Sequence, residues 1–368
     1  MAKEIPRTRI ALDASLAYGT STGDSTYWSG LIEGLSQLSL DLEICFVSPI
    51  AEPPEFPASS HLRWVHAPAG SSRWWNLVTF PQTVRKLEAS IAHTQYSISP
   101  LMRTPAITTV HDVSFFIGPQ WFSAKNRNLL QLGVRSACRR AKRVMTVSET
   151  SRSEIEQYIP AAKGKVRAVY NATPSWIQAM DRETARMQVQ SEFGVMEPYV
   201  LTVGTRWERK NMDLAIRAMS GLRSELPHRL LVTGKKGASR DGYGERGIAT
   251  GYVSNRSLSA LYSAAELYLA PSFHEGFGIP VLEAFRCGCP VLSSMGGALP
   301  EVVANEEAII RSWETRDWTA KIEQVLSDPS KLKRMSEQGR ARERDFSWTS
   351  TAEKTLAVYA EVLQETKK

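Results

Sequence analysis

The chain has 368 residues, 42% of them hydrophobic and 23% charged, which excludes a disordered protein and predicts about two domains. Its formal net charge of +7 favours anionic partners such as nucleotide-sugars, phospholipid surfaces or nucleic acid. The four cysteines form no disulfide framework or zinc pattern, and Asp13 interrupts the apolar run near the N-terminus, so we expect a cytoplasmic protein without signal peptide or membrane span.

Short apolar segments alternate with helical patterns in the first half of the chain, which predicts a parallel sheet wound with helices. A first strand is expected at 9–15, followed by a Gly/Ser/Thr-rich loop at 19–25 and a helix at 27–38. Further strands are predicted at 42–48, 59–65, 91–93, 106–110, 143–147 and 165–169.

The alternation pauses after Asn171 in a polar helical segment at 175–192 and restarts with a strand at 199–204. This restart predicts an N-terminal domain over 1–173 and a C-terminal domain over 174–348. Later strands are expected at 229–234, 248–253, 266–272 and 290–294. A last helix at 349–366 carries apolar residues at helical spacing.

The stretch HEGFGIPVLEAFRCGCPVL, residues 274–292, contains a glycine-rich turn that opens a helix expected at 280–287. Gly276 and Gly278 permit unusual dihedral angles and close approach of a ligand, and Pro280 fits the first helical turn. The first amides of the helix, at the positive end of its dipole, favour an anion such as a diphosphate.

Two acids flank this turn, Glu275 before it and Glu283 one turn into the helix. One carboxylate can bind a ribose and the other a transferred sugar. A buried connection with a solvent-facing glutamate is the alternative. The joint match of glycines, proline and the following CGCPVL strand favours the binding site.

VGTRWERKN, residues 203–211, places Arg209 and Lys210 after a strand, at the edge where open parallel sheets bind ligands. A guanidinium and an ammonium there would neutralise a diphosphate leaving group. Asn211 or Asp213 can begin the next helix. The alternative is a solvated basic loop.

Weaker signals lie in the first half of the chain. His111 follows the strand of TVHDVSFF and can hydrogen-bond a sugar, although such a histidine is often structural. Gly23 offers another anion-facing turn. A basic helix in VRSACRRAKRVMTV either lies on anionic lipid or is a solvated face; its cations are Arg135, Arg139, Arg140, Lys142 and Arg143.

Two absences narrow the chemistry. The chain contains no Asp-x-Asp pair for a metal-bridged sugar nucleotide and no phosphate loop of the G-x4-G-K-[ST] type. We therefore expect no required metal or cofactor, and no nucleic acid partner because the basic residues are scattered. The aromatic cluster Trp74, Trp75 and Phe80 is either an acceptor or interfacial patch or simple packing.

With these segments the chain resembles the family-4 glycosyltransferases, an α/β class with the GT-B fold of two Rossmann-like, doubly wound parallel-sheet domains facing a central cleft. HEGFGIPVLEAFRCGCPV followed by GGALPEVV resembles the family's Glu-x7-Glu signature and the turn after it. Other segments resemble the family in the same order: TVHDVSFF, TVSETSRSEI, VGTRWERKN, LLVTGKKG, TGYVSNRSLSALYSAAELYLAPS and FSW.

The resemblance implies a retaining transferase that moves a hexose, mannose by analogy, from an NDP-sugar to a saccharide or lipid-linked acceptor in cell-surface polysaccharide or glycoconjugate synthesis. It implies catalytic or donor-side roles for His111, Lys210, Glu275, Gly23, Arg206, Arg209, Val253, Gly276, Phe277, Gly278, Ile279 and Glu283. Glu275 would contact the donor sugar, Glu283 the ribose and Val253 the base. Amides around 277–279 would touch the phosphates, and the last helix would cross back onto the acceptor-side domain.

Three positions depart from the family pattern. Thr205 stands where many relatives carry arginine, so the phosphate role rests on Lys210 with Arg209 or Arg206 compensating. Ser25 and Thr26 follow Gly23 where relatives resemble G-I-G-R-Y, and NATP at Asn171 replaces an NG turn. A sugar-nucleotide epimerase or phosphorylase of the same fold, and a degenerate member that only binds nucleotide-sugars or glycans, remain alternatives.

Overall fold

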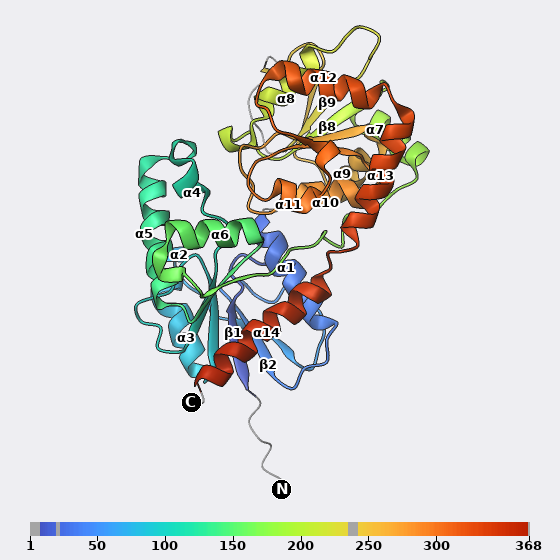
Figure 1. Cartoon of the computed structure of the whole chain (residues 1–368). Coiled ribbons are helices and arrows are strands. Elements are labelled where there is room, and N and C mark those ends of the chain that lie inside the picture. Colours follow the sequence, from blue (N-terminus) through green and yellow to red (C-terminus); the bar gives the residue numbers. More distant parts are fainter. Residues whose placement is uncertain (1–7, 20–22, 235–241, 367–368) are drawn as a thin grey trace. The chain divides into compact units, whose positions relative to one another are not determined.

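The computed structural model describes residues 8–19, 23–234 and 242–366 (Figure 1). The chain divides into two compact units. The N-terminal unit comprises Met1–Asn171 and Ser347–Lys368, and the C-terminal unit comprises Ala172–Phe346. Each unit is built on its own parallel sheet, as the alternating pattern predicts.

The N-terminal unit contains a seven-stranded sheet in the order β3-β2-β1-β4-β5-β6-β7. Its strands are β1 (Arg9–Asp13), β2 (Glu43–Ser48), β3 (Leu62–His66), β4 (Ile91–Gln95), β5 (Ala106–Thr109), β6 (Arg143–Thr146) and β7 (Val166–Ala168). Its helices are α1 (Gly23–Ser36), α2 (Ser72–Trp74), η1 (Trp75–Thr79), α3 (Phe80–Lys86), α4 (Ser114–Ile117), η2 (Pro119–Trp121), α5 (Ala124–Arg140), α6 (Glu149–Tyr158) and η3 (Pro160–Ala162). The strand order reverses between β1 and β4, which is where doubly wound sheets open a crevice at their carboxyl edge.

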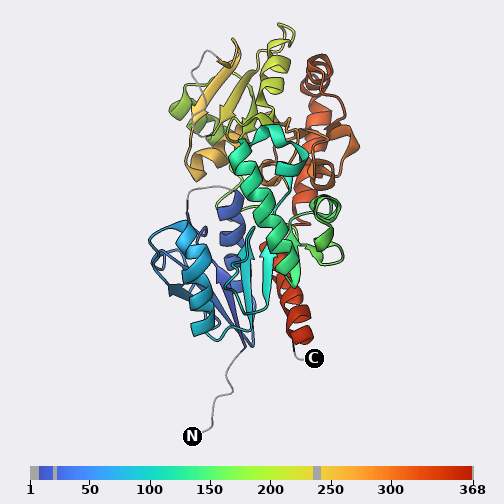
Figure 2. The ribbon, with the colours of Figure 1, turned by 90° about the vertical axis from the view of Figure 1, so that its left-hand side faces the viewer.

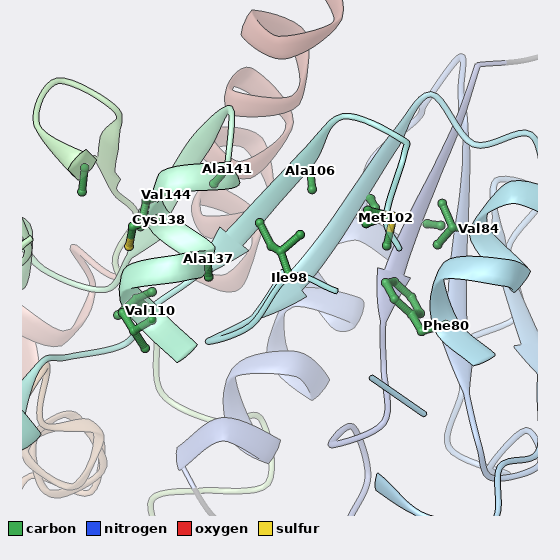
Figure 3. Close-up of a cluster of buried hydrophobic side chains, with 14 of the residues drawn as sticks. Phe80, Val84, Ile98, Met102, Ala106, Val110, Ala137, Cys138, Ala141 and Val144 are labelled. Carbon is green, nitrogen blue, oxygen red and sulfur yellow. The ribbon is translucent and has the colours of Figure 1, made fainter. Parts of the chain in front are cut away.

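One face of this sheet is covered by a continuous apolar cluster (Figure 3). Phe80 and Val84 of α3 and Ala137 and Cys138 of α5 are buried in it, together with residues of the sheet. Because both faces of a parallel sheet are covered by helices, its strands are apolar almost throughout, as in EICFVS of β2.

The final helix, α14 (Trp348–Thr366), belongs to the N-terminal unit and lies beside α1 (Figure 1). A Cβ at Gly30 would lie 2.1 Å from the Trp348 ring, so α1 must carry glycine there to let α14 approach. The Tyr359 hydroxyl is hydrogen-bonded to Nδ1 of His93 at 2.7 Å. Glu361 accepts from Arg143 at 2.8 Å. These contacts attach the last helix to the first sheet.

The C-terminal unit contains a six-stranded sheet in the order β10-β9-β8-β11-β12-β13. Its strands are β8 (Tyr199–Val203), β9 (Arg229–Thr233), β10 (Gly247–Gly251), β11 (Leu267–Ala270), β12 (Val291–Ser294) and β13 (Ile309–Ile310). Its helices are α7 (Arg182–Phe193), η4 (Glu208–Lys210), α8 (Met212–Ser220), α9 (Asn255–Ala264), α10 (Ile279–Arg286), α11 (Leu299–Val303), η6 (Glu306–Ala308), α12 (Thr315–Leu326) and α13 (Pro329–Glu343).

Three predicted helices differ from the structure by more than one residue at an end. The helix expected at 27–38 is α1, which already begins at Gly23 and ends at Ser36. The segment expected to be helical from 175 becomes α7 only at Arg182, because the Asp181 carboxylate caps the helix by accepting from the Thr184 amide at 3.0 Å. The basic helix ends at Arg140, so the prediction that it carries Lys142 and Arg143 is wrong. Arg143 begins β6 instead, since the chain turns into the sheet after Ala141.

Candidate functional site

Two glycines shape the carboxyl edge of the second sheet. Gly204 follows β8 with φ of 139°, and Gly234 follows β9 with φ of 156°. A Cβ at Gly234 would lie 2.0 Å from the Gly204 carbonyl oxygen, so only glycine allows the two strand ends to approach. The chain between Gly204 and α8 then forms the short helix η4, whose last two residues are Arg209 and Lys210.

Arg209 and Lys210 converge on one carboxylate. Nζ of Lys210 donates to Oε1 of Glu275 at 2.6 Å, and a guanidinium nitrogen of Arg209 donates to Oε2 at 3.1 Å. The Ser272 hydroxyl also donates to Oε1 at 2.6 Å. The side chains of Arg209, Lys210 and Glu275 are only 12%, 18% and 11% exposed, so these charges interact with little screening by water.

The pKa of Glu275 is lowered by these neighbouring cations. Burial by itself would raise it, but the positive charges of Lys210 and Arg209 and the hydrogen bonds to the carboxylate lower the pKa to about 2. Glu275 is therefore ionised at neutral pH. Two cations share one anion, so the cluster keeps an excess positive charge that a diphosphate can neutralise.

A second pair of glycines holds the Glu275 backbone in place. A Cβ at Gly296 would lie 2.2 Å from the Ser272 carbonyl oxygen, and one at Gly297 would lie 2.3 Å from the Glu275 carbonyl oxygen. The Ala298 amide donates to that Glu275 oxygen at 2.9 Å. The GGA segment that follows β12 is therefore required for the position of the site acid.

Helix α10 begins at Ile279, four residues after Glu275 in the chain. Gly278 precedes it with φ of 105°, and Ile279 and Pro280 form its first turn. Gly276 and Phe277 are buried, and the Phe277 ring packs edge-on against Phe346 at 5.7 Å. The Phe277 side chain is thus part of the core of the C-terminal unit.

Glu283 lies buried within α10. Its Oε2 accepts from the Tyr262 hydroxyl of α9 at 2.9 Å. Burial raises the pKa of Glu283 to about 7, against the lowering effects of that hydrogen bond and of the Lys210 charge. Glu275, just before α10, is therefore ionised at neutral pH, whereas Glu283, within that helix, is partly protonated.

A small pocket lies at this junction of β8, β11, η4 and α10. Its lining combines the charged groups with apolar strand ends: Thr202, Val203, Lys210, Met212, Tyr268, Leu269, Ala270, Pro271, Ser272, Glu275, Gly278, Pro280, Val281 and Leu299. Lys210, Glu275 and Gly278, which the sequence singled out, all line it.

Two further predicted residues of the C-terminal unit lie outside this cluster. Arg206 pairs with Asp213 at 2.7 Å, and its guanidinium lies 5.2 Å above the Tyr243 ring. Val253 is half-buried in the turn between β10 and α9. Arg206 therefore pairs with the Asp213 carboxylate in the first turn of α8 and makes no ion pair with Glu275.

Gly23 and His111 lie in the N-terminal unit. Gly23 begins α1, and Asp24 in the first turn approaches Nε2 of His111 with Oδ1 at 3.4 Å. The His111 ring packs edge-on against Tyr27 at 4.8 Å. Burial lowers the pKa of His111, although Asp24 and Asp112 raise it, so the imidazole is mainly neutral. The strand before it, β5, ends at Thr109, one residue earlier than the predicted strand at 106–110.

Sequence patterns did not single out Asp24, Tyr262 or Ser272. Tyr262 and Ser272 contact the two glutamates from a different helix and from a strand end, and their distances in sequence follow no motif. Asp24 could have been found, because it directly follows Gly23 in the glycine turn. Ser25 and Thr26, the departures next to it, are buried in the N-terminal unit.

In the part of the chain that the structure describes, no three His, Cys, Asp or Glu side chains gather closely enough to hold a metal ion. Over the same residues, every helix is too short or too polar to span a bilayer.

Two family models match the chain. Residues 22–174 match "Glycosyltransferase Family 4", and residues 183–342 match "Glycosyl transferases group 1". The two matches lie on the N-terminal unit and on the C-terminal unit, respectively.

Among curated proteins, the chain is similar to O-antigen chain mannosyltransferase B of Escherichia coli, with 31% identity over 265 residues, covering 69% of this chain and 70% of the relative. It is also similar to the serotype-specific mannosyltransferase WbdA of Escherichia coli, with 28% identity over 243 residues. That match covers 61% of this chain and 29% of WbdA, so the chain corresponds to less than a third of that protein.

Solved structures share the fold over nearly the whole length. The sucrose-phosphate synthase of Thermosynechococcus elongatus superposes with a TM-score of 0.77 at 20% identity, covering 98% of this chain and all of that one. The Anabaena protein HepE, solved in complex with UDP-glucose, gives a TM-score of 0.70 at 15% identity, covering 96% of this chain and 100% of HepE. At such identities the likeness concerns the fold alone, and the fold is GT-B.

Proposed function

The chain belongs to family 4 of the glycosyltransferases, and from this premise we propose that it transfers a hexose from an NDP-sugar to a hydroxyl group of a saccharide or lipid-linked glycan. The configuration of the anomeric carbon is retained, and no metal or other cofactor is required. The bond from the anomeric carbon to the diphosphate breaks, a bond to the acceptor oxygen forms on the same face, and the acceptor proton passes to the departing phosphate oxygen.

The observation that carries the proposal is the convergence of Lys210, Arg209 and Glu275 beside the first turn of α10. The excess positive charge of this cluster, together with the amides of 276–279, would meet the negative charge that grows on the leaving diphosphate. Because these side chains are largely buried, their charges stabilise that anion more than solvated cations would.

The two acids would divide the donor between them. Glu275, ionised, would accept hydrogen bonds from hydroxyls of the sugar once the diphosphate draws the cations away. Glu283 would bind the ribose hydroxyls, and Val253 would lie by the base. In the N-terminal unit, Gly23 would lie under the donor, and the neutral imidazole of His111 would face the sugar near the reaction centre.

Mannose is the proposed sugar because two relatives that match the chain are named as mannosyltransferases. The O-antigen relative supports an acceptor in cell-surface polysaccharide synthesis. The neighbour solved with UDP-glucose supports a nucleotide-sugar donor. We further propose a cytoplasmic location with peripheral contact of the N-terminal unit to the inner face of the membrane.

Thermal-shift measurements with UDP, GDP, dTDP and their sugars test the donor site, since a ligand that binds only the folded state raises the melting temperature. A clear preference for one nucleotide-sugar is expected, followed by transfer to a glycan acceptor. Lys210→Ala should lower kcat/KM by ~10²-fold or more, as for the loss of one preorganised charge-stabilising donor. Full activity of that variant contradicts the site.

The alternative activities give different products. An epimerase converts the NDP-sugar with no acceptor present, and a degenerate member binds the donor in calorimetry but forms no product with any acceptor mixture. Either result would replace the transferase proposal.

A further inference from the structure

The outer face of α5 exposes two large apolar side chains. The helix buries Val134, Ala137 and Cys138 against the sheet, whereas Leu129 and Leu132 are 66% and 67% exposed. Residues three apart lie on the same face of a helix, so these leucines form one patch that points away from the core. Their exposure needs an explanation, because large apolar side chains grouped on a surface mark interaction sites.

The same helix is basic. It contains five lysine and arginine residues and no acid. Lys125 and Arg139 lie on the face of the two leucines, and neither forms an ion pair with any residue in the described part of the chain. Arg135 is held with its guanidinium 4.6 Å above the Phe116 ring. Over the longer segment 56–148 the sequence has 12 Lys and Arg against two acids, so this stretch carries a strong excess of positive charge, although Arg63 and Arg143 are paired with acids from outside it.

Hydrogen bonds connect this helix to two further exposed apolar segments. Arg140 at the end of α5 donates to the Ser99 carbonyl oxygen at 3.1 Å, which fixes the loop that carries Leu101, 56% exposed. The Ser99 hydroxyl donates to the Leu77 carbonyl oxygen at 2.8 Å, and Leu77 is 48% exposed. Trp74, the last residue of α2, lies three residues before Leu77 and is 58% exposed. In Figure 2, α5 and the α2–α3 segment both lie on the side of the N-terminal unit that faces the viewer.

We call this surface the apolar–basic face. It consists of Trp74, Leu77, Leu101, Leu129, Leu132, Arg103, Lys125 and Arg139.

We propose that the apolar–basic face docks on an anionic phospholipid bilayer. At such an interface leucine and tryptophan side chains enter the acyl boundary while lysine and arginine reach the phosphates, so one partner satisfies both halves of the face. A nucleic acid or other polyanion would pair with the cations but leave the five apolar side chains in water. The face gives the peripheral contact proposed above a defined surface, and it does not depend on sugar transfer.

The test uses the full chain with unilamellar vesicles of phosphatidylglycerol and phosphatidylcholine, compared with phosphatidylcholine alone, in a flotation assay. Binding to the anionic vesicles only is expected. Lys125→Gln with Arg139→Gln should weaken it on the order of tenfold or more, since each cation near an anionic surface contributes about fivefold. Leu129→Ser with Leu132→Ser should weaken it similarly, and the remaining binding should be more sensitive to salt.

A matched control changes an exposed apolar residue and an exposed cation of the C-terminal unit, Met187→Ser with Arg316→Gln, and should bind like the unchanged protein. Absence of binding to anionic vesicles overturns the proposal. If the variant Leu129→Ser with Leu132→Ser binds the anionic vesicles as well as the unchanged protein does, and both proteins bind heparin equally, the leucines do not contribute and the face binds a polyanion instead. Binding of a donor nucleotide by the same variants shows whether they are folded. If the unchanged protein itself binds no donor nucleotide, the proposed transferase activity is contradicted, whereas the proposal for this face is not affected.

Discussion

Replacing Glu275 with glutamine is expected to destabilise the ligand-free protein and to tighten its binding of nucleoside diphosphates. Lys210 and Arg209 lower the pKa of Glu275 from 4.5 to about 2 in spite of its burial. At 1.36 kcal/mol per pKa unit, this shift corresponds to about 3 kcal/mol of stabilisation at neutral pH. Because the folded pKa lies below the unfolded one, this contribution is complete above pH 4.5 and is lost as the pH falls through about 2.

The gain in diphosphate binding has the same origin. In the ligand-free protein the Glu275 carboxylate neutralises one of the two cations that contact it. Glutamine leaves both positive charges for the ligand, and two unit charges about 4 Å apart interact by roughly 4 kcal/mol at an effective dielectric constant of 20. After ligand and protein desolvation, affinity for UDP or GDP should rise by about tenfold. Transfer activity should fall, because the proposed contact to the sugar is removed.

Urea unfolding at pH 7 and pH 3 measures the loss of stability, and calorimetry with UDP and GDP measures the affinity. Glu208→Gln is the matched control, since Glu208 is an exposed acid of η4, the short helix that carries Arg209 and Lys210, and forms no ion pair with any residue the structure describes. A Glu275→Gln protein as stable as the unchanged one at pH 7, with weaker diphosphate binding, would refute the charge-sharing arrangement of this cluster.

Two further substitutions test the remaining geometry. Burial raises the pKa of Glu283 from 4.5 to about 7, so its contribution to stability is present below pH 4.5 and lost as the pH rises through about 7. Glu283→Gln should thus be more stable than the unchanged protein at pH 8, by up to about 3 kcal/mol in urea unfolding, and equal stabilities at pH 5 and pH 8 would contradict this. Gly297→Ala places a methyl group 2.3 Å from the Glu275 carbonyl oxygen and at positive φ, so thermal unfolding should show a loss of about 2 kcal/mol or more and donor binding should weaken. Gly70→Ala, where a Cβ meets no atom within 4 Å, serves as its control, and equal melting temperatures of the two variants would exclude the steric reason.

Much of the fold followed from local patterns. Parallel strands buried on both faces read as apolar runs, so the strands of the two sheets were predicted with errors of only a few residues at most ends. The exception is the edge strand β13 (Ile309–Ile310), which was missed because two residues are too short to form a pattern. The errors occurred where tertiary contacts decide. The helix at 175–192 starts late because its first turn is fixed by Asp181, and α5 stops at Arg140 because the chain enters the sheet.

The sequence by itself determined the α/β class, the turn at Gly276–Gly278 and the position of Arg209, Lys210 and Glu275 shortly after a strand, because each of these rests on short-range spacing around a strand end. Only the tertiary structure decided that both cations share the Glu275 carboxylate, that Tyr262 donates to Glu283, and that Arg206 turns to Asp213. The cations that contact Glu275 lie 66 and 65 residues away in the sequence. Burial acts to raise the pKa of both glutamates, and the positive charges of Lys210 and Arg209 reverse this shift only at Glu275, so the outcome depends on how distant elements pack.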